Sequence, residues 1–128
     1  LSSDVPRNFQ GTKLRLHKSS ESSHLNVIYV DRIMGPEGER YGSNVVIDPT
    51  TNEKGEVTSF YGSRDIQIST FATGIVLAHE IMHAWGGLLE RQGQNNLMND
   101  GNMYCILDAG QIEAAARHSR GGRGEVKN

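Results

Sequence analysis

The sequence predicts an α+β domain in which short strands come first and two helices follow. Polar and apolar residues alternate at several places in the first half of the chain, as they do in strands. Apolar residues at helical spacing begin at residue 71 and return after residue 108. With 128 residues, no internal repeat and no dividing linker, residues 1–128 fit a single domain.

The composition is that of an ordinary globular protein. An apolar fraction of 36% and a net charge of -2 indicate no general attraction to nucleic acid or to membranes. No apolar run approaches the roughly 20 residues that span a bilayer. We therefore expect neither nucleic acid nor a membrane as a partner, and we expect a monomer. The chain begins with leucine and contains no signal segment, which predicts a mature or excised fragment. Its single cysteine, Cys105, lies among apolar residues and is expected to be buried.

The first predicted strand lies near residues 13–17. Leu14 and Leu16 alternate there with polar residues, after a lead-in at 1–11 that we expect to be irregular and flexible. A serine-rich loop at 19–23 separates it from residues 25–30, whose β-branched and aromatic residues predict a buried strand.

Two further strands are predicted before the helices. A short strand at 44–47 should stop at Asp48-Pro49, and residues 50–56 form a polar loop. In residues 65–69, Ile66 and Ile68 alternate with polar residues. Such a half-polar strand is expected at an edge of the sheet.

The first helix should follow at once, capped by Ser69 or Thr70 and ended by the glycines at 86–87. The second helix should begin at the capping residue Asp108 and end at the glycines at 121–122. Residues 121–128 are rich in glycine and charge, so we expect a flexible, solvated terminus.

The stretch HEIMHAWGGLLE, residues 79–90, covers the end of the first predicted helix and the residues that follow it. Residues four apart in a helix lie on one face, so His79 and His83 can bind one metal ion. Glu80 projects toward the same cleft and could exchange a proton with a water molecule that the metal activates. Two histidine ligands favour zinc.

The residues His79 to Gly86, followed by Asn96-Leu97-Met98-Asn99, resemble the metzincin clan of zinc metallopeptidases. The clan's motif is HExxHxxGxxH, or a final aspartate, and a methionine turn follows it. The resemblance covers about residues 12–120, but its specific motifs lie only within 79–99. It implies a small twisted sheet with a substrate-binding edge strand at 66–69, a long active-site helix, a methionine turn and a C-terminal helix. The clan's long first helix has no counterpart before Leu14.

The third metal ligand departs from the family pattern. The family spacing falls on Leu89, which cannot bind a metal, and Glu90 follows it. If Gly87 is an additional turn residue, the Glu90 carboxylate reaches the metal, and carboxylate oxygen is an accepted zinc ligand. Alternatives are Glu113, which would complete the site as a later glutamate does in the gluzincin clan, and less strongly Asp100 or Asp108.

The resemblance implies a zinc-dependent endopeptidase, secreted or extracellular, that hydrolyses protein or peptide substrates. Zinc would be held by His79, His83 and Glu90, with Glu80 as general base and acid. Tyr104, just after the methionine turn, could stabilise the oxyanion or simply pack. The alternative is a metzincin-like module that binds a metal or a partner without proteolysis. Leu89 at the ligand position and the missing first helix favour that alternative, whereas Glu80 argues against it.

Overall fold

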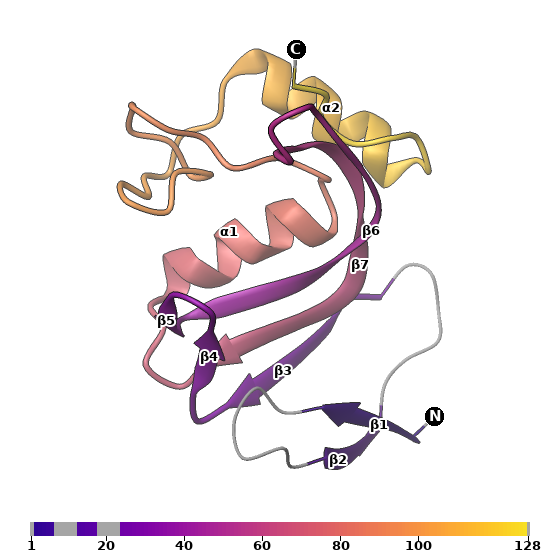
Figure 1. Cartoon of the computed structure of the whole chain (residues 1–128), viewed down its shortest axis with the longest axis vertical. Coiled ribbons are helices and arrows are strands. Elements are labelled where there is room, and N and C mark those ends of the chain that lie inside the picture. The colour runs from indigo at the N-terminus through magenta and orange to yellow at the C-terminus, as the bar shows by residue number, and fades with distance from the viewer. Residues whose placement is uncertain (1, 7–12, 18–23, 128) are drawn as a thin grey trace.

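The computed structural model describes the backbone of residues 2–6, 13–17 and 24–127, and the side chains of residues 24–127. A mixed three-stranded sheet forms one layer, and helix α1 (Gly74–Ala84) lies across one of its faces (Figure 1). Helix α2 (Ala109–Ser119) lies at one end of this assembly. The predicted α+β class is confirmed at this level. Within the described ranges, no helix is long and apolar enough to cross a membrane.

The sheet has the order β3–β7–β6, formed by β3 (Asn26–Val30), β7 (Val57–Ser69) and β6 (Gly42–Thr51). β3 runs parallel to β7, whereas β6 is antiparallel to it. The predicted edge strand at 65–69 is therefore wrong, because this segment is the end of the central strand. Its buried residues Ile66 and Ile68 pack toward α1, and the polar residues between them point to the other face. The alternation marks a sheet covered on one face, not an edge.

The edge strands are β3 and β6, and both differ in part from prediction. β3 occupies the expected residues, but Val27 and Tyr29 are 37% and 61% exposed, since α1 covers the middle of the sheet instead of this edge. β6 extends well beyond the predicted residues 44–47. Asp48 takes a positive φ of 52° there, and the pairing with β7 shifts between Ile47 and Thr50. Asp48-Pro49 thus distorts the strand without ending it.

Two hairpins precede β6. β2 (Lys13–His17) lies where it is predicted and pairs antiparallel with β1 (Ser2–Pro6). The expected irregular lead-in is wrong for residues 2–6, and its remainder lies outside the described residues, as does the serine-rich loop at 19–23. β4 (Ile33–Gly35) and β5 (Gly38–Arg40) form the second hairpin.

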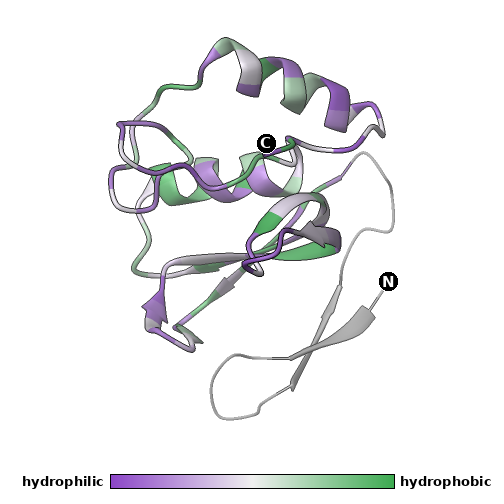
Figure 2. Cartoon of the chain, turned by 45° about the horizontal axis from the view of Figure 1, so that its top comes forward, coloured by the Kyte–Doolittle hydropathy of each residue, from purple (hydrophilic) through white to green (hydrophobic). Residues whose placement is uncertain are grey.

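The helices end as predicted, but α1 starts later. Its N-cap is Thr73 and not Ser69 or Thr70, because β7 continues through Ser69. Asp108 caps α2 as predicted: its carboxylate accepts a hydrogen bond from the Gln111 N–H at 2.8 Å. The Gln111 side chain accepts one from the Asp108 N–H in return. In Figure 2 both helices carry hydrophobic and hydrophilic positions.

Two apolar clusters share α1. One lies between α1 and the sheet and contains Ile66, Ile68 and Val76. The other lies between α1, α2 and the loop that joins them, and includes Leu88 and the fully buried Met98. The joining loop, residues 85–108, is therefore anchored at its middle although it has no regular structure.

Cys105 lies in this loop and is exposed, contrary to prediction. Its neighbours Tyr104 and Ile106 are also at least half exposed. Tyr104, Cys105 and Ile106 therefore face solvent, whereas Met103 and Leu107 on either side are partly buried against the apolar clusters.

Candidate metal centre

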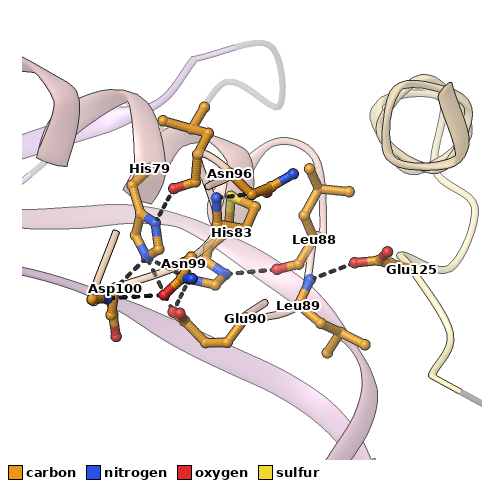
Figure 3. A network of polar contacts seen from close by, with 12 residues as sticks. His79, His83, Leu88, Leu89, Glu90, Asn96, Asn99, Asp100 and Glu125 are labelled. Atoms are coloured by element: carbon orange, nitrogen blue, oxygen red, sulfur yellow. Dashed lines mark hydrogen bonds and ion pairs between the residues drawn. The ribbon is translucent and has the colours of Figure 1, made fainter. Parts of the chain in front are cut away.

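His79 and His83 project from the same face of α1, one turn apart (Figure 3). The Nδ1 atom of His79 lies 2.7 Å from the Leu97 carbonyl oxygen, and that of His83 lies 2.6 Å from the Leu88 carbonyl oxygen. A carbonyl oxygen only accepts, so both Nδ1 atoms carry a proton and donate it. Each neutral ring then presents an unprotonated Nε2, the arrangement that a metal-binding histidine requires.

The Glu90 carboxylate meets both Nε2 atoms. Its Oε1 lies 3.0 Å from His79 Nε2 and 2.7 Å from His83 Nε2, and the two nitrogens are 3.1 Å apart. Among the described residues, these three side chains form a group that could hold a metal ion. The three ligands predicted from the sequence are thus brought together.

The two glycines after α1 allow the loop to deliver Glu90. Gly87 has a φ of +61°, and its N–H donates to the His83 carbonyl oxygen at 3.1 Å. A Cβ on Gly86 would come within 2.7 Å of the Met82 carbonyl oxygen. Both positions therefore need glycine. Beyond them Leu88 and Leu89 are buried, which leaves Glu90 as the residue that faces the histidines.

The donor set fits a divalent cation. With both Nδ1 protons used by carbonyl groups, the two Nε2 atoms and the Glu90 oxygen are three acceptors within 3.1 Å of one another. Three acceptors cannot hydrogen-bond to one another, so a proton or a metal ion has to lie between them. Two ligands of a tetrahedral zinc at about 2.0–2.1 Å lie about 3.3 Å apart, so a small outward movement would admit the ion. Two imidazoles and one carboxylate form a common zinc ligand set.

The pKa values of His79 and Glu90 also indicate that this site favours a bound positive charge. Burial alone would lower the pKa of His79, but the hydrogen bonds to Glu90 and to the Leu97 carbonyl group raise it to about 9. Burial likewise opposes ionisation of Glu90, but the hydrogen bonds from His79 and His83 lower its pKa below the usual range. Without a metal, a proton on His79 neutralises this site, and a metal ion would have to displace it.

Glu80 lies beside the cluster and is not part of it. Its side chain is buried, and burial raises the pKa of its carboxyl group although both histidines oppose this. No hydrogen-bond partner holds it within residues 24–127. Gly42 on β6 leaves the space for it: a Cβ there would lie 2.6 Å from Glu80 Cγ and 2.8 Å from Oε2. A buried carboxyl group with a raised pKa and no fixed partner suits proton transfer.

A cleft of about 880 Å³ opens in front of these groups. Its walls come from the β4–β5 hairpin, from Tyr41 to Asn44 and Val46 at the outer edge of the sheet, and from the loop after α1. Glu80, His83, Glu90 and Asp100 all line it. The cluster thus sits in a cleft large enough for several residues of a bound chain.

The other candidates from the sequence are placed differently. Asp100 approaches the cluster, with its Oδ1 3.2 Å from His79 Nε2, but its side chain is 70% exposed at the rim. Glu113 is exposed on α2 and outside the cluster, and Asp108 caps α2 and pairs with Arg91. Tyr104 is 55% exposed and does not line the cleft. The gluzincin-type site therefore has no geometric support here.

A buried amide pair supports the cluster from behind, and sequence reasoning misses it. Asn96 and Gln111 exchange two side-chain hydrogen bonds of 3.0 and 2.9 Å, and Asn96 also accepts from the Met98 N–H at 2.9 Å. Asn96 precedes Leu97, whose carbonyl orients His79. The spacing of Asp108 and Gln111 is a capping-box signal that predicts the helix start, but nothing local predicts the partner at Asn96.

Comparison with known proteins identifies no relative: no family model, curated protein or solved structure matches this chain.

Proposed function

We propose that this protein is a zinc-dependent peptidase related to the metzincins, with His79, His83 and Glu90 as ligands. The observation that carries the proposal is the juxtaposition of two features in one cleft. Three metal-binding atoms converge there, and a buried carboxyl group with no fixed partner, that of Glu80, lies next to them. A metal site with a purely structural role has no need for the second feature.

The chemistry divides between the ion and the chain. A zinc ion held by the three ligands would polarise a carbonyl group and lower the pKa of a water molecule. Glu80 accepts a proton from the attacking water and returns it to the leaving amine, for which its raised pKa is suited. The Leu97 and Leu88 carbonyl groups keep the histidine rings in the orientation and tautomer that leave Nε2 free.

We propose that the substrate binds along β6 and not along residues 66–69. β6 has β7 on one side and no strand on the other in the described part of the chain. Its residues 42–44 line the cleft beside Glu80. An extended peptide could add to this edge through main-chain hydrogen bonds, which is a common mode of peptide recognition. This would place a peptide bond near the cluster.

Zinc stoichiometry combined with peptide cleavage tests the proposal. Glu80→Gln should retain zinc at the wild-type stoichiometry but lower the cleavage rate on the order of 10²–10⁴-fold, because it removes the proton acceptor and leaves the ligands. A generic fluorogenic peptide library provides the substrate. If Glu80→Gln also loses its zinc, Glu80 has a different role from the one proposed.

Glu90→Gln should instead weaken zinc binding strongly, since a neutral amide oxygen replaces a charged ligand. Glu113→Gln is the matched control, because it makes the same change at an exposed position on α2. Loss of zinc in the control together with normal binding in Glu90→Gln would move the third ligand to Glu113.

A second candidate is a module that binds metal or a partner without proteolysis. The exposure of Tyr104, outside the lining of the cleft, favours it, because the expected oxyanion donor is then missing. Zinc binding without cleavage by the wild type, across the same peptide library, would support this second candidate.

A further inference from the structure

The C-terminal segment is bound to the rest of the molecule, although its composition predicts a flexible end. The Glu125 N–H donates to the Gly87 carbonyl oxygen at 2.9 Å, and the Lys127 N–H donates to the Thr58 carbonyl oxygen at 2.8 Å. Gly124 passes so close that a Cβ on it would lie 2.4 Å from the Gly87 carbonyl oxygen. The segment therefore lies between β7 and the turn that leads to Glu90. Composition cannot predict these partners, since they are distant in sequence.

The Glu125 side chain holds the residues on either side of Glu90. Its Oε1 accepts a hydrogen bond from the Leu89 N–H at 3.0 Å, and its Oε2 accepts one from Arg91 Nη2 at 2.7 Å. The Glu125 side chain is only 15% exposed. Figure 3 shows it across the Leu88–Glu90 segment from the two histidines. One partly buried carboxylate thus contacts the chain on both sides of Glu90.

We infer that Glu125 is a positioning residue for the metal ligand Glu90. Glu90 lies in a loop without regular structure, and its side chain is 44% exposed. Holding such a glutamate against a metal costs backbone and side-chain entropy, and a backbone that is already fixed removes the backbone part of this cost. Glu125 supplies that fixation from outside the ligand shell, as the supporting partners of metal ligands do. The inference rests on the His79–His83–Glu90 site and not on peptidase activity.

Arg91 transmits the restraint to the rest of the loop. Its backbone N–H donates to the Met98 carbonyl oxygen at 2.8 Å, and its guanidinium also pairs with Asp108 at 3.1 Å. Through Arg91, the Glu125 carboxylate is therefore linked to the turn that carries Met98 and to the start of α2. Removal of the carboxylate should loosen the Glu90 side of the site while the histidine rings keep their own carbonyl partners.

Titration of the metal-free protein with Zn²⁺, in competition with a chelating dye, tests the inference. Glu125→Gln should bind Zn²⁺ about 10–100-fold more weakly than the wild type, the usual cost of losing a supporting partner of a ligand. The visible absorption of the Co²⁺-saturated variant should also differ from that of the wild type, because the carboxylate no longer keeps its place. Glu113→Gln, an identical change at an exposed site, should alter neither measurement.

The two measurements separate positioning from general stability. A merely structural Glu125 would lower the melting temperature of the metal-free protein and leave the Co²⁺ spectrum unchanged. If Glu125→Gln binds Zn²⁺ within twofold of the wild type and has an unchanged Co²⁺ spectrum, the inference is overturned. Loss of the metal in Glu90→Gln would show in that case that the metal site itself is correct. If the wild type binds no metal, the metal site is wrong and the inference with it. If Glu125→Gln does not fold, Arg91→Gln, which keeps the Leu89 contact, decides by the same criteria.

Discussion

Substitution of Gly42 by alanine should impair hydrolysis without removing the metal. The new Cβ would lie 2.6 Å from Glu80 Cγ, whereas ordinary contacts begin at 3.4 Å, so Glu80 must retreat by at least about 0.8 Å. A displacement of about 1 Å at a reacting group costs on the order of 10²-fold in rate. Because Glu80 can swing toward the cleft, we expect a stability loss near the lower end of the roughly 1–3 kcal/mol typical of overpacking.

The assay compares kcat/KM on a peptide substrate with the zinc content and the thermal midpoint of each variant. Gly74→Ala is the matched control, since a Cβ at Gly74 meets no atom within 4 Å. The control should keep the wild-type rate. A wild-type rate in Gly42→Ala would refute the reasoning, because it would mean that the position of Glu80 does not matter for hydrolysis.

Two further predictions concern the support and the protonation of the site. Asn96→Ala removes the acceptor of both the Met98 N–H and the Gln111 side-chain amide and leaves these two donors buried. The free energy of unfolding, measured with denaturant, should fall by on the order of 3 kcal/mol. The exposed neighbour variant Asn95→Ala is the control, and an equal loss in both variants would contradict the role of the amide pair. In the chelator-treated protein the pKa of His79 lies at about 9, raised from 6.5 by Glu90 and Leu97 against the effect of burial. Because the pKa of His79 is higher in the folded than in the unfolded protein, the protonated ring stabilises the fold in full below pH 6.5. The melting temperature should therefore fall as the pH rises from 6.5 to 9. The same fall in Glu90→Gln would show that Glu90 is not the cause.

The sequence alone determined the parts of the site that depend on short-range geometry. Helical spacing places His79 and His83 on one face, and the paired glycines predict both the helix end and the extra turn residue before Glu90. The Asp108 cap is equally local. These features can be predicted from the sequence because each depends on residues within one or two turns, where backbone preference and side-chain chemistry act together.

The sheet order was decided by tertiary structure. Alternation at residues 65–69 shows that one face is buried, but it does not distinguish a central strand with one open face from an edge strand. The remainder of β7 contains the strand-forming residues Val57, Phe60 and Tyr61, but Gly62, a poor strand former, separates them from the alternating residues 65–69, so the sequence does not show that both belong to one strand. Gly62 is there because a Cβ would lie 2.2 Å from the His83 carbonyl oxygen where α1 passes over the strand.

Tertiary structure also decided the surroundings of the candidate metal ligands. The space for Glu80 depends on Gly42, the ring orientation of His79 depends on the Leu97 carbonyl group, and the place of Glu90 depends on Glu125. Each of these partners is at least 18 positions away in sequence, as in the pair of His79 and Leu97. Their identity follows only from how the chain packs, because a single hydrogen bond or a missing methyl group leaves no periodic pattern in the sequence.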